Sequence, residues 1–236
     1  MIHITALQKK FGKNEVLSGL DLEVVDGGIF AILGPNGSGK TTLIKTLLGM
    51  VIPNKGRISV MGQSVKNQWK YREEIAYLPQ IANFPGNLKV NELIGMIKDL
   101  RQNSSNDAKL ISLFGLEPFL EKKLATLSGG TKQKVNLVLT FMFNCPLIVL
   151  DEPTSGLDPL AVIGLKTLIN EEKQKGKTIL ITSHIMQFVE DMADEIIYLL
   201  EGKIYFKGSL AQLKAHTAQN NVEHAIATIA TLNTHV

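Results

Sequence analysis

The chain has 236 residues, of which 44% are hydrophobic and 20% are charged, and its net charge is +3. This length is enough for a sizeable core, and the small net charge does not by itself indicate a nucleic-acid partner. The chain has a single cysteine, Cys145, so it cannot form an internal disulfide. The first residues lack the pattern of a signal peptide, and the apolar stretch at residues 135–150 is too short and too interrupted to span a bilayer, so any membrane role is expected to depend on a partner.

The first 80 residues combine strand patterns with one glycine-rich loop. Apolar and polar side chains alternate within residues 1–30, as at Ile2 and Ile4, and this alternation predicts strands. A continuous apolar run at residues 29–33 predicts a buried strand. The other elements predicted in this part are a helix at residues 43–48 and strands at residues 57–61 and 75–78.

The glycine-rich loop, residues 34–41, reads Gly-Pro-Asn-Gly-Ser-Gly-Lys-Thr and matches the pattern of a phosphate-binding loop. Glycines let the backbone approach a ligand, and the loop N–H groups together with the following helix favour an anion. Lys40 is expected to reach the β- and γ-phosphates, and the Thr41 hydroxyl is expected to ligate Mg²⁺. The nucleotide-binding residues predicted here are Gly34, Pro35, Asn36, Gly37, Ser38, Gly39, Lys40, Thr41 and Thr42.

Beyond residue 80 the pattern changes twice. Residues 81–144 carry apolar side chains at helical spacing, and the predicted helices are at residues 90–100, 108–114 and 135–143. From residue 145 strands alternate with helices: strands are predicted at residues 147–150 and 178–182, a helix after Asp158, a hairpin at residues 195–207 and a helix after Ser209. This alternation predicts an α/β fold with a mainly parallel sheet, helices on both faces and an antiparallel N-terminal edge.

These elements predict one domain with an insertion. Residues 1–213 are expected to form the domain, with a core of residues 1–80 and 145–213 and a helical insertion at residues 81–144. Residues 214–236 are expected to form a tail with a short helix. This helix either docks on its own domain or serves regulation or partner binding.

Two adjacent acidic residues follow the apolar strand at residues 147–150. In an open α/β sheet, the carboxyl end of such a strand faces the ligand. Asp151 is therefore predicted to hold Mg²⁺, and Glu152 is predicted to act as general base on the water that attacks the γ-phosphate. A solvated acidic loop is the alternative, which the phosphate-binding loop upstream disfavours.

A third motif, Leu-Ser-Gly-Gly-Thr-Lys-Gln at residues 127–133, resembles the signature sequence of ABC-type ATPases. Three further stretches match the family in the same order along the chain: Gln80 resembles the Q-loop glutamine, residues 151–158 resemble the Walker B segment and D-loop, and His184 resembles the switch histidine. The chain thus resembles the nucleotide-binding subunit of an ABC transporter over residues 1 to about 213. It is most similar to the single-domain ATPases of the two-component exporter group, and within this group it resembles the ATPase that serves nitrous-oxide-reductase (copper) maturation. The tail contains three histidines that could in principle bind copper, but their spacing is not that of metal ligands; they are His216, His224 and His235.

The resemblance implies a P-loop NTPase that binds ATP and Mg²⁺ and hydrolyses ATP. Phe11 would stack on adenine, although packing is its alternative role. Gln80 would touch Mg²⁺, report to the membrane subunit and join Glu152 and His184 in catalysis. The signature residues Ser128, Gly129 and Gly130 would bind the γ-phosphate held by the opposite subunit of a homodimer.

The resemblance also implies a transmembrane permease subunit as partner, which would hold the chain at the cytoplasmic face of the membrane. The surface from Ile81 to Leu93 is expected to dock this partner, because Ile81, Phe84, Pro85 and Leu88 lie on an expected exposed loop. A soluble ABC-type ATPase acting on the ribosome or DNA is the first alternative, and a small-molecule kinase or GTPase is the second. No nucleic acid is expected, because the charge is nearly balanced.

Overall fold

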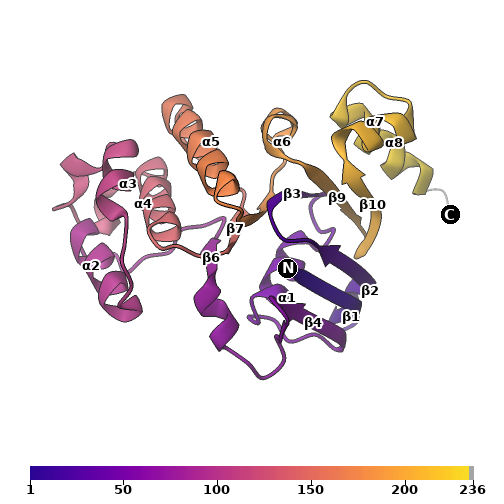
Figure 1. Cartoon of the computed structure of the whole chain (residues 1–236), viewed down its shortest axis with the longest axis horizontal. Helices are drawn as coiled ribbons and strands as arrows, with labels where there is room; N and C mark the ends of the chain where they lie inside the picture. Colours follow the sequence, from indigo (N-terminus) through magenta and orange to yellow (C-terminus); the bar gives the residue numbers. More distant parts are fainter. Residues whose placement is uncertain (234–236) are drawn as a thin grey trace.

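The computed structural model describes residues 1–233, and His235 lies outside these residues. Figure 1 shows the strands in the middle of the molecule, with the inserted helices at one end and the C-terminal helices at the other. The predicted fold class is confirmed, with one difference in how the antiparallel strands are arranged.

The main sheet has six strands in the order β10-β9-β3-β8-β7-β6. Five of them are parallel to one another, and β10 runs antiparallel to β9 at the edge. The two strands at the centre of the site, β7 and β8, are buried along their whole length, which explains why they read as continuous apolar runs. The bounds are β3 (Gly28–Leu33), β6 (Ile75–Leu78), β7 (Leu147–Asp151), β8 (Thr178–Thr182), β9 (Glu195–Leu200) and β10 (Lys203–Ser209).

The N-terminal antiparallel strands form a second sheet of their own instead of an edge of the main sheet. Its order is β2-β1-β4-β5, with β1 (Ile2–Phe11), β2 (Asn14–Val24), β4 (Lys55–Val60) and β5 (Gln63–Ser64). Its alternating side chains bury only one face, which packs on one face of the main sheet around Phe30, Val149 and Leu180. A strand of this pattern is suited to a sheet that is covered on one side only.

Helices cover the main sheet and build the insertion. Helix α1 (Lys40–Leu47) follows β3, and α5 (Pro159–Gln174) and α6 (Met186–Met192) follow β7 and β8. The insertion contains α2 (Val90–Arg101), α3 (Asp107–Leu113) and α4 (Gly129–Phe141). Helix α4 begins six residues before the predicted start at residue 135, because the Ser128 hydroxyl accepts a hydrogen bond from the Thr131 N–H and caps it.

The C-terminal residues form two helices. Helix α7 (Leu210–Thr217) is capped by Ser209. It continues through residues 213 and 214, where the boundary between the domain and the tail is expected, and this boundary stays a prediction. Helix α8 (Val222–Asn233) buries Val222 and Ile229 in a cluster that also contains Val189 of α6. The tail helix therefore docks on its own domain, in contact with α7 and with α6, the helix that follows His184.

Candidate functional site

The phosphate-binding loop joins β3 to α1, and two of its glycines cannot be replaced without moving neighbours. Gly34 has φ 154° and Gly39 has φ 107°, values that other residues rarely adopt. A Cβ atom at Gly34 would collide with the carbonyl oxygen of Leu199, and one at Gly39 would lie 2.9 Å from the carbonyl oxygen of Val16. The backbone of the loop is thus fixed by close packing on β9 and β2.

Lys40, the first residue of α1, is folded over this loop. Its Nζ donates hydrogen bonds to the carbonyl oxygens of Gly34 at 2.6 Å and Pro35 at 3.0 Å. Burial lowers the pKa of Lys40 from its ordinary value, and the negative charges of Glu152 and Asp151 oppose this shift. The carboxylates therefore help to keep a positive charge beside the loop.

A cavity of ≈ 280 Å³ opens above the loop. One buried hydroxyl in the loop, Ser38 Oγ, has no hydrogen-bond partner among the described residues. A phosphate group would fit this cavity, because it could bond to the unpartnered hydroxyl, to the cationic Lys40 and to the backbone N–H groups of the loop. The residues that line the cavity are Asn14, Val16, Asn36, Gly37, Gly39, Lys40, Thr41, Thr42, Gln80, Asp151 and Glu152.

The acidic side of the cavity is built at the ends of β7 and β8. Asp151 is paired in register with Thr182, whose Oγ1 donates a hydrogen bond of 2.6 Å to Asp151 Oδ1. Glu152 has φ 51° and is only 7% exposed. Its Oε2 lies 2.7 Å from Nδ1 of His184. Burial and the negative charge of Asp151 raise the pKa of Tyr77 to about 12, so this phenol stays neutral beside the carboxylate.

The structure thus brings together most of the predicted site residues but not all of them. The loop, Gln80, Asp151 and Glu152 line one cavity, and His184 contacts Glu152. Phe11 is 51% exposed and lies outside the residues that line the cavity; Lys9 Nζ is 4.7 Å from the centre of its ring. The adenine role of Phe11 therefore stays a prediction.

The signature residues are also separate from this cavity. Ser128, Gly129 and Gly130 form the beginning of α4 and are not among the residues that line it. A Cβ atom at Gly130 would lie 2.6 Å from the carbonyl oxygen of Gly156, so the signature packs against the segment that follows Glu152. The first residues of α4 are therefore held in place but do not reach the nucleotide cavity of their own chain.

Comparison with known proteins identifies the family. The family model described as ABC transporter matches residues 17–155, more than half of the chain. The chain belongs to the ABC transporter family. The uncharacterized ABC transporter ATP-binding protein YhaQ of Bacillus subtilis is 31% identical over 227 residues, which cover 94% of this chain and 76% of that protein.

Two solved structures support the same fold. An ATP-binding subunit of an ABC transporter has a TM-score of 0.91 and 29% identity, covering 98% of this chain and 99% of that one. A dimeric ATP-binding cassette in a post-hydrolysis state, bound to ADP and Pi, has a TM-score of 0.80 and 23% identity, covering 89% of this chain and 99% of that one. The chain is thus the ATP-hydrolysing subunit of an ABC transporter, and the soluble and kinase-like alternatives find no support.

Within this ABC ATPase, sequence reasoning missed three residues at the site. Asn14 and Val16 line the cavity from the start of β2, a region with no motif to mark it. Thr182 contacts both Asp151 and Glu152. A feature of the sequence could have identified it as a site residue. It is the polar last residue of an apolar strand that neighbours β7, and the carboxyl ends of parallel strands meet at one edge.

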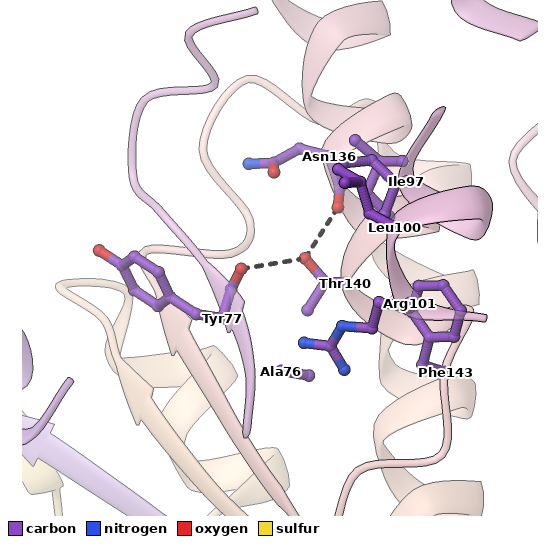
Figure 2. A pocket seen from close by; sticks show the side chains of 9 residues that line it. Ala76, Tyr77, Ile97, Leu100, Arg101, Asn136, Thr140 and Phe143 are labelled. Atoms are coloured by element: carbon purple, nitrogen blue, oxygen red, sulfur yellow. Dashed lines mark hydrogen bonds between the residues drawn. The ribbon is translucent and has the colours of Figure 1, made fainter. Parts of the chain in front are cut away.

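A second hollow of ≈ 400 Å³ lies where the insertion meets the main sheet (Figure 2). Its walls come from β6, α2 and α4, and the Thr140 hydroxyl joins two of them, 3.4 Å from the carbonyl oxygen of Tyr77. Arg101 lies over the ring of Phe143 on the far wall. No helix among residues 1–233 of this ABC subunit is long and apolar enough to cross a membrane.

Proposed function

We propose that two copies of this chain bind two ATP molecules between them and move a transmembrane permease by closing and opening. The observation that carries this proposal is the separation of the signature residues, Ser128 to Gly130, from the cavity lined by the phosphate-binding loop, Gln80, Asp151 and Glu152. A signature that does not face its own cavity is available to a second copy across a two-fold axis. The related cassette bound to ADP and Pi is itself dimeric, which supports the proposal.

Within each site the chain's own residues have separate roles. Lys40 and the N–H groups of the loop bind the phosphates, and Glu152 accepts the proton of the attacking water. His184 holds the Glu152 carboxylate in place through their 2.7 Å contact. Thr41, Gln80 and Asp151 are among the residues that line the cavity, and their side chains carry oxygen atoms, which are the ligands that Mg²⁺ prefers. When bound there, Mg²⁺ would offset the charge of the phosphates.

The permease is proposed to dock where the insertion meets the main sheet. Ile81 is 78% exposed and Leu100, at the rim of the second hollow, is 72% exposed. Asn136 in the same hollow donates a hydrogen bond of 3.2 Å to the carbonyl oxygen of Pro79, the neighbour of Gln80. A permease segment in this hollow would therefore press on a residue linked to the nucleotide cavity.

The predicted docking surface needs one correction. Phe84 and Leu88 were expected to be exposed on a loop, but both are partly buried against the core of the insertion. Their apolar side chains stabilise the helices instead of facing solvent. Ile81 and Pro85 of the predicted surface are exposed, and so are two apolar residues beyond it in α2, Met96 and Leu100.

The cargo stays unassigned by the chain itself, because specificity of a transporter is carried by its membrane subunits. None of the three relatives reported above has a name that refers to copper or to nitrous-oxide reductase. Among the residues that the structure describes, no three His, Cys, Asp or Glu side chains cluster in a way that could hold a metal ion. Service to nitrous-oxide-reductase maturation therefore stays a prediction, as does a place at the cytoplasmic face of the membrane.

Dimerisation driven by ATP tests this function. Glu152→Gln is expected to slow hydrolysis and keep ATP bound, so with ATP and Mg²⁺ it should elute at twice the mass of one chain. The control is a chain that carries both Lys40→Ala and Glu152→Gln, which should stay monomeric. A Glu152→Gln chain that binds ATP and still elutes as a monomer would contradict the proposal.

A further inference from the structure

We propose that Thr182 is a positioning residue of the hydrolysis site, whose single hydroxyl fixes Asp151 and Glu152 relative to each other. The inference rests on the roles proposed above for those two acidic residues. It comes from a contact that no motif marks: the hydroxyl at the end of β8 bonds to both residues at the end of β7.

The register of the two strands creates this contact. Strands β7 and β8 are parallel neighbours, and Asp151 is the pairing partner of Thr182. The Thr182 hydroxyl donates to Asp151 Oδ1 at 2.6 Å and accepts from the Glu152 N–H at 3.0 Å. A hydroxyl has one hydrogen to donate and two lone pairs to accept with, so both bonds can exist together. Thr182 is therefore satisfied only when both residues are in their observed places.

Both acidic residues need this support. Asp151 is 3% exposed, and a buried carboxylate without a hydrogen bond is costly. Glu152 has φ 51°, in the left-handed region that side chains other than glycine seldom adopt. Its N–H is held by two oxygens of one residue, the Thr182 carbonyl at 3.2 Å and the Thr182 hydroxyl. These bonds keep the backbone in a conformation that directs the carboxylate to His184.

The residue type agrees with this role. A β-branched threonine fits a buried strand and has few side-chain rotamers, so the direction of its hydroxyl is fixed by the backbone. Valine has the same shape without the hydroxyl, and serine keeps the hydroxyl without the methyl group. The pair Thr182→Val and Thr182→Ser therefore separates hydrogen bonding from packing.

The same strand provides a matched control. Thr178, at the opposite end of β8, is fully buried like Thr182. Its hydroxyl is also bonded to backbone, because it accepts from the Gly27 N–H at 2.8 Å. Thr178→Val therefore removes an equally buried hydroxyl from the same strand, far from the cavity.

The experiment compares Thr182→Val, Thr182→Ser and Thr178→Val in the full chain. ATP binding is measured by calorimetry with and without Mg²⁺, next to turnover and thermal unfolding. Thr182→Val should weaken the Mg²⁺-dependent part of ATP binding and lower kcat, each by about 10- to 100-fold, as for other groups that orient a metal ligand. Binding without Mg²⁺ should change little, and Thr182→Ser should restore most of both losses. Thr178→Val should lower the unfolding temperature alone.

The inference fails if Thr182→Val keeps the Mg²⁺ dependence and the kcat of the wild type, or if Thr178→Val changes them as much. It also fails if Thr182→Ser is as impaired as Thr182→Val. Should Thr182→Val not fold, Thr182→Ala removes the hydroxyl without placing a methyl group against Asp151, and the same comparison applies. Glu152→Gln in the same assay separates the two proposals: if it hydrolyses ATP normally the proposed function is wrong, and if it is impaired while Thr182→Val is normal only this inference is wrong.

Discussion

Nδ1 of His184 lies 2.7 Å from Oε2 of Glu152, and the two side chains differ sharply in exposure. The Glu152 side chain is 9% exposed, whereas the His184 side chain is 75% exposed. The imidazole therefore joins a buried carboxylate to the surface of the protein. The contact also joins the end of β7 to the turn that precedes α6. A movement of α6 would therefore shift the Glu152 carboxylate.

The first prediction concerns the chemical role of Glu152. Glu152→Gln keeps the shape and the hydrogen-bonding side chain but removes the base, so hydrolysis should slow by at least ~100-fold while ATP binding persists. Single-turnover hydrolysis and ATP affinity are the two measurements. His184→Ala should slow hydrolysis less, because it removes only the contact that holds Glu152. Normal turnover by Glu152→Gln would instead make His184 the candidate base.

The second prediction concerns the charge of Lys40. Lys40→Ala removes the ammonium that lies over the loop, and hydrolysis should fall by roughly 100-fold or more. The matched control is Lys45→Ala, an exposed lysine of the same helix, which should leave hydrolysis and ATP affinity unchanged. Wild-type hydrolysis by Lys40→Ala would show that residues 34–41 are not the phosphate-binding loop.

Much of this fold could be predicted because local signals were strong. Continuous apolar runs marked β3, β7 and β8, and the loop and its helix followed from glycine spacing and one lysine. The residues Asp151 and Glu152 were found because they end such a run. These features depend on neighbours in the sequence, which a single chain displays directly.

The remainder depends on contacts between distant segments. The polar end of an apolar strand marks Thr182 as a candidate, but its bonds to Asp151 and Glu152 depend on the pairing of β7 with β8. Asn14 lines the cavity only because β2 passes beside the loop. The burial of Phe84 depends on the packing of the insertion, which its own loop sequence does not indicate. Tertiary contacts of this kind have no period or motif in the sequence.

The third prediction concerns the docking surface. Ile81→Asp places a charge on an apolar residue that is 78% exposed, so it should weaken attachment to the permease and leave ATP hydrolysis by the purified chain intact. The measurement is the fraction of the chain recovered with membranes of the native cell. Val25→Asp is the control, since Val25 is also exposed and lies next to β3 at the end away from the loop. Equal recovery of Ile81→Asp and the wild type would contradict this docking surface.

The fourth prediction concerns a buried ion pair far from the cavity. Glu172 of α5 is 5% exposed and pairs with the equally buried Lys177 and with Lys175. Burial alone would raise the pKa of Glu172, but the hydrogen bonds from Lys175 and Lys177 outweigh it and lower the pKa below its ordinary value. The pair therefore contributes stability above the unfolded-state pKa, and this contribution is lost as the pH falls through the lower folded-state pKa.

Glu172→Gln leaves Lys177 buried without its partner and should lower the free energy of unfolding at neutral pH by about 3 kcal/mol, the lower end for breaking a buried pair. The difference from the wild type should shrink in acid. Glu171→Gln, in the neighbouring surface pair with Lys109, should cost at most about 1 kcal/mol. Urea unfolding at several pH values checks both, and a loss that does not depend on pH would contradict the stated cause.

The last prediction concerns the central claim that each ATP site is built from two chains. Lys40→Ala breaks the loop of its own chain, and Ser128→Arg places a long cation at the beginning of α4. In a heterodimer of these two variants, one site combines an intact loop with an intact signature. In a heterodimer of the wild type with a chain carrying both substitutions, neither site is complete, although one chain is entirely normal.

ATP hydrolysis by these two heterodimers, each isolated through two different affinity tags, is the most direct test. The account predicts that the Lys40→Ala and Ser128→Arg pair recovers part of the wild-type activity, whereas the pair of wild type and double variant is inactive. A site contained within one chain predicts the reverse order. An active wild-type and double-variant pair, beside an inactive pair of single variants, would contradict the account.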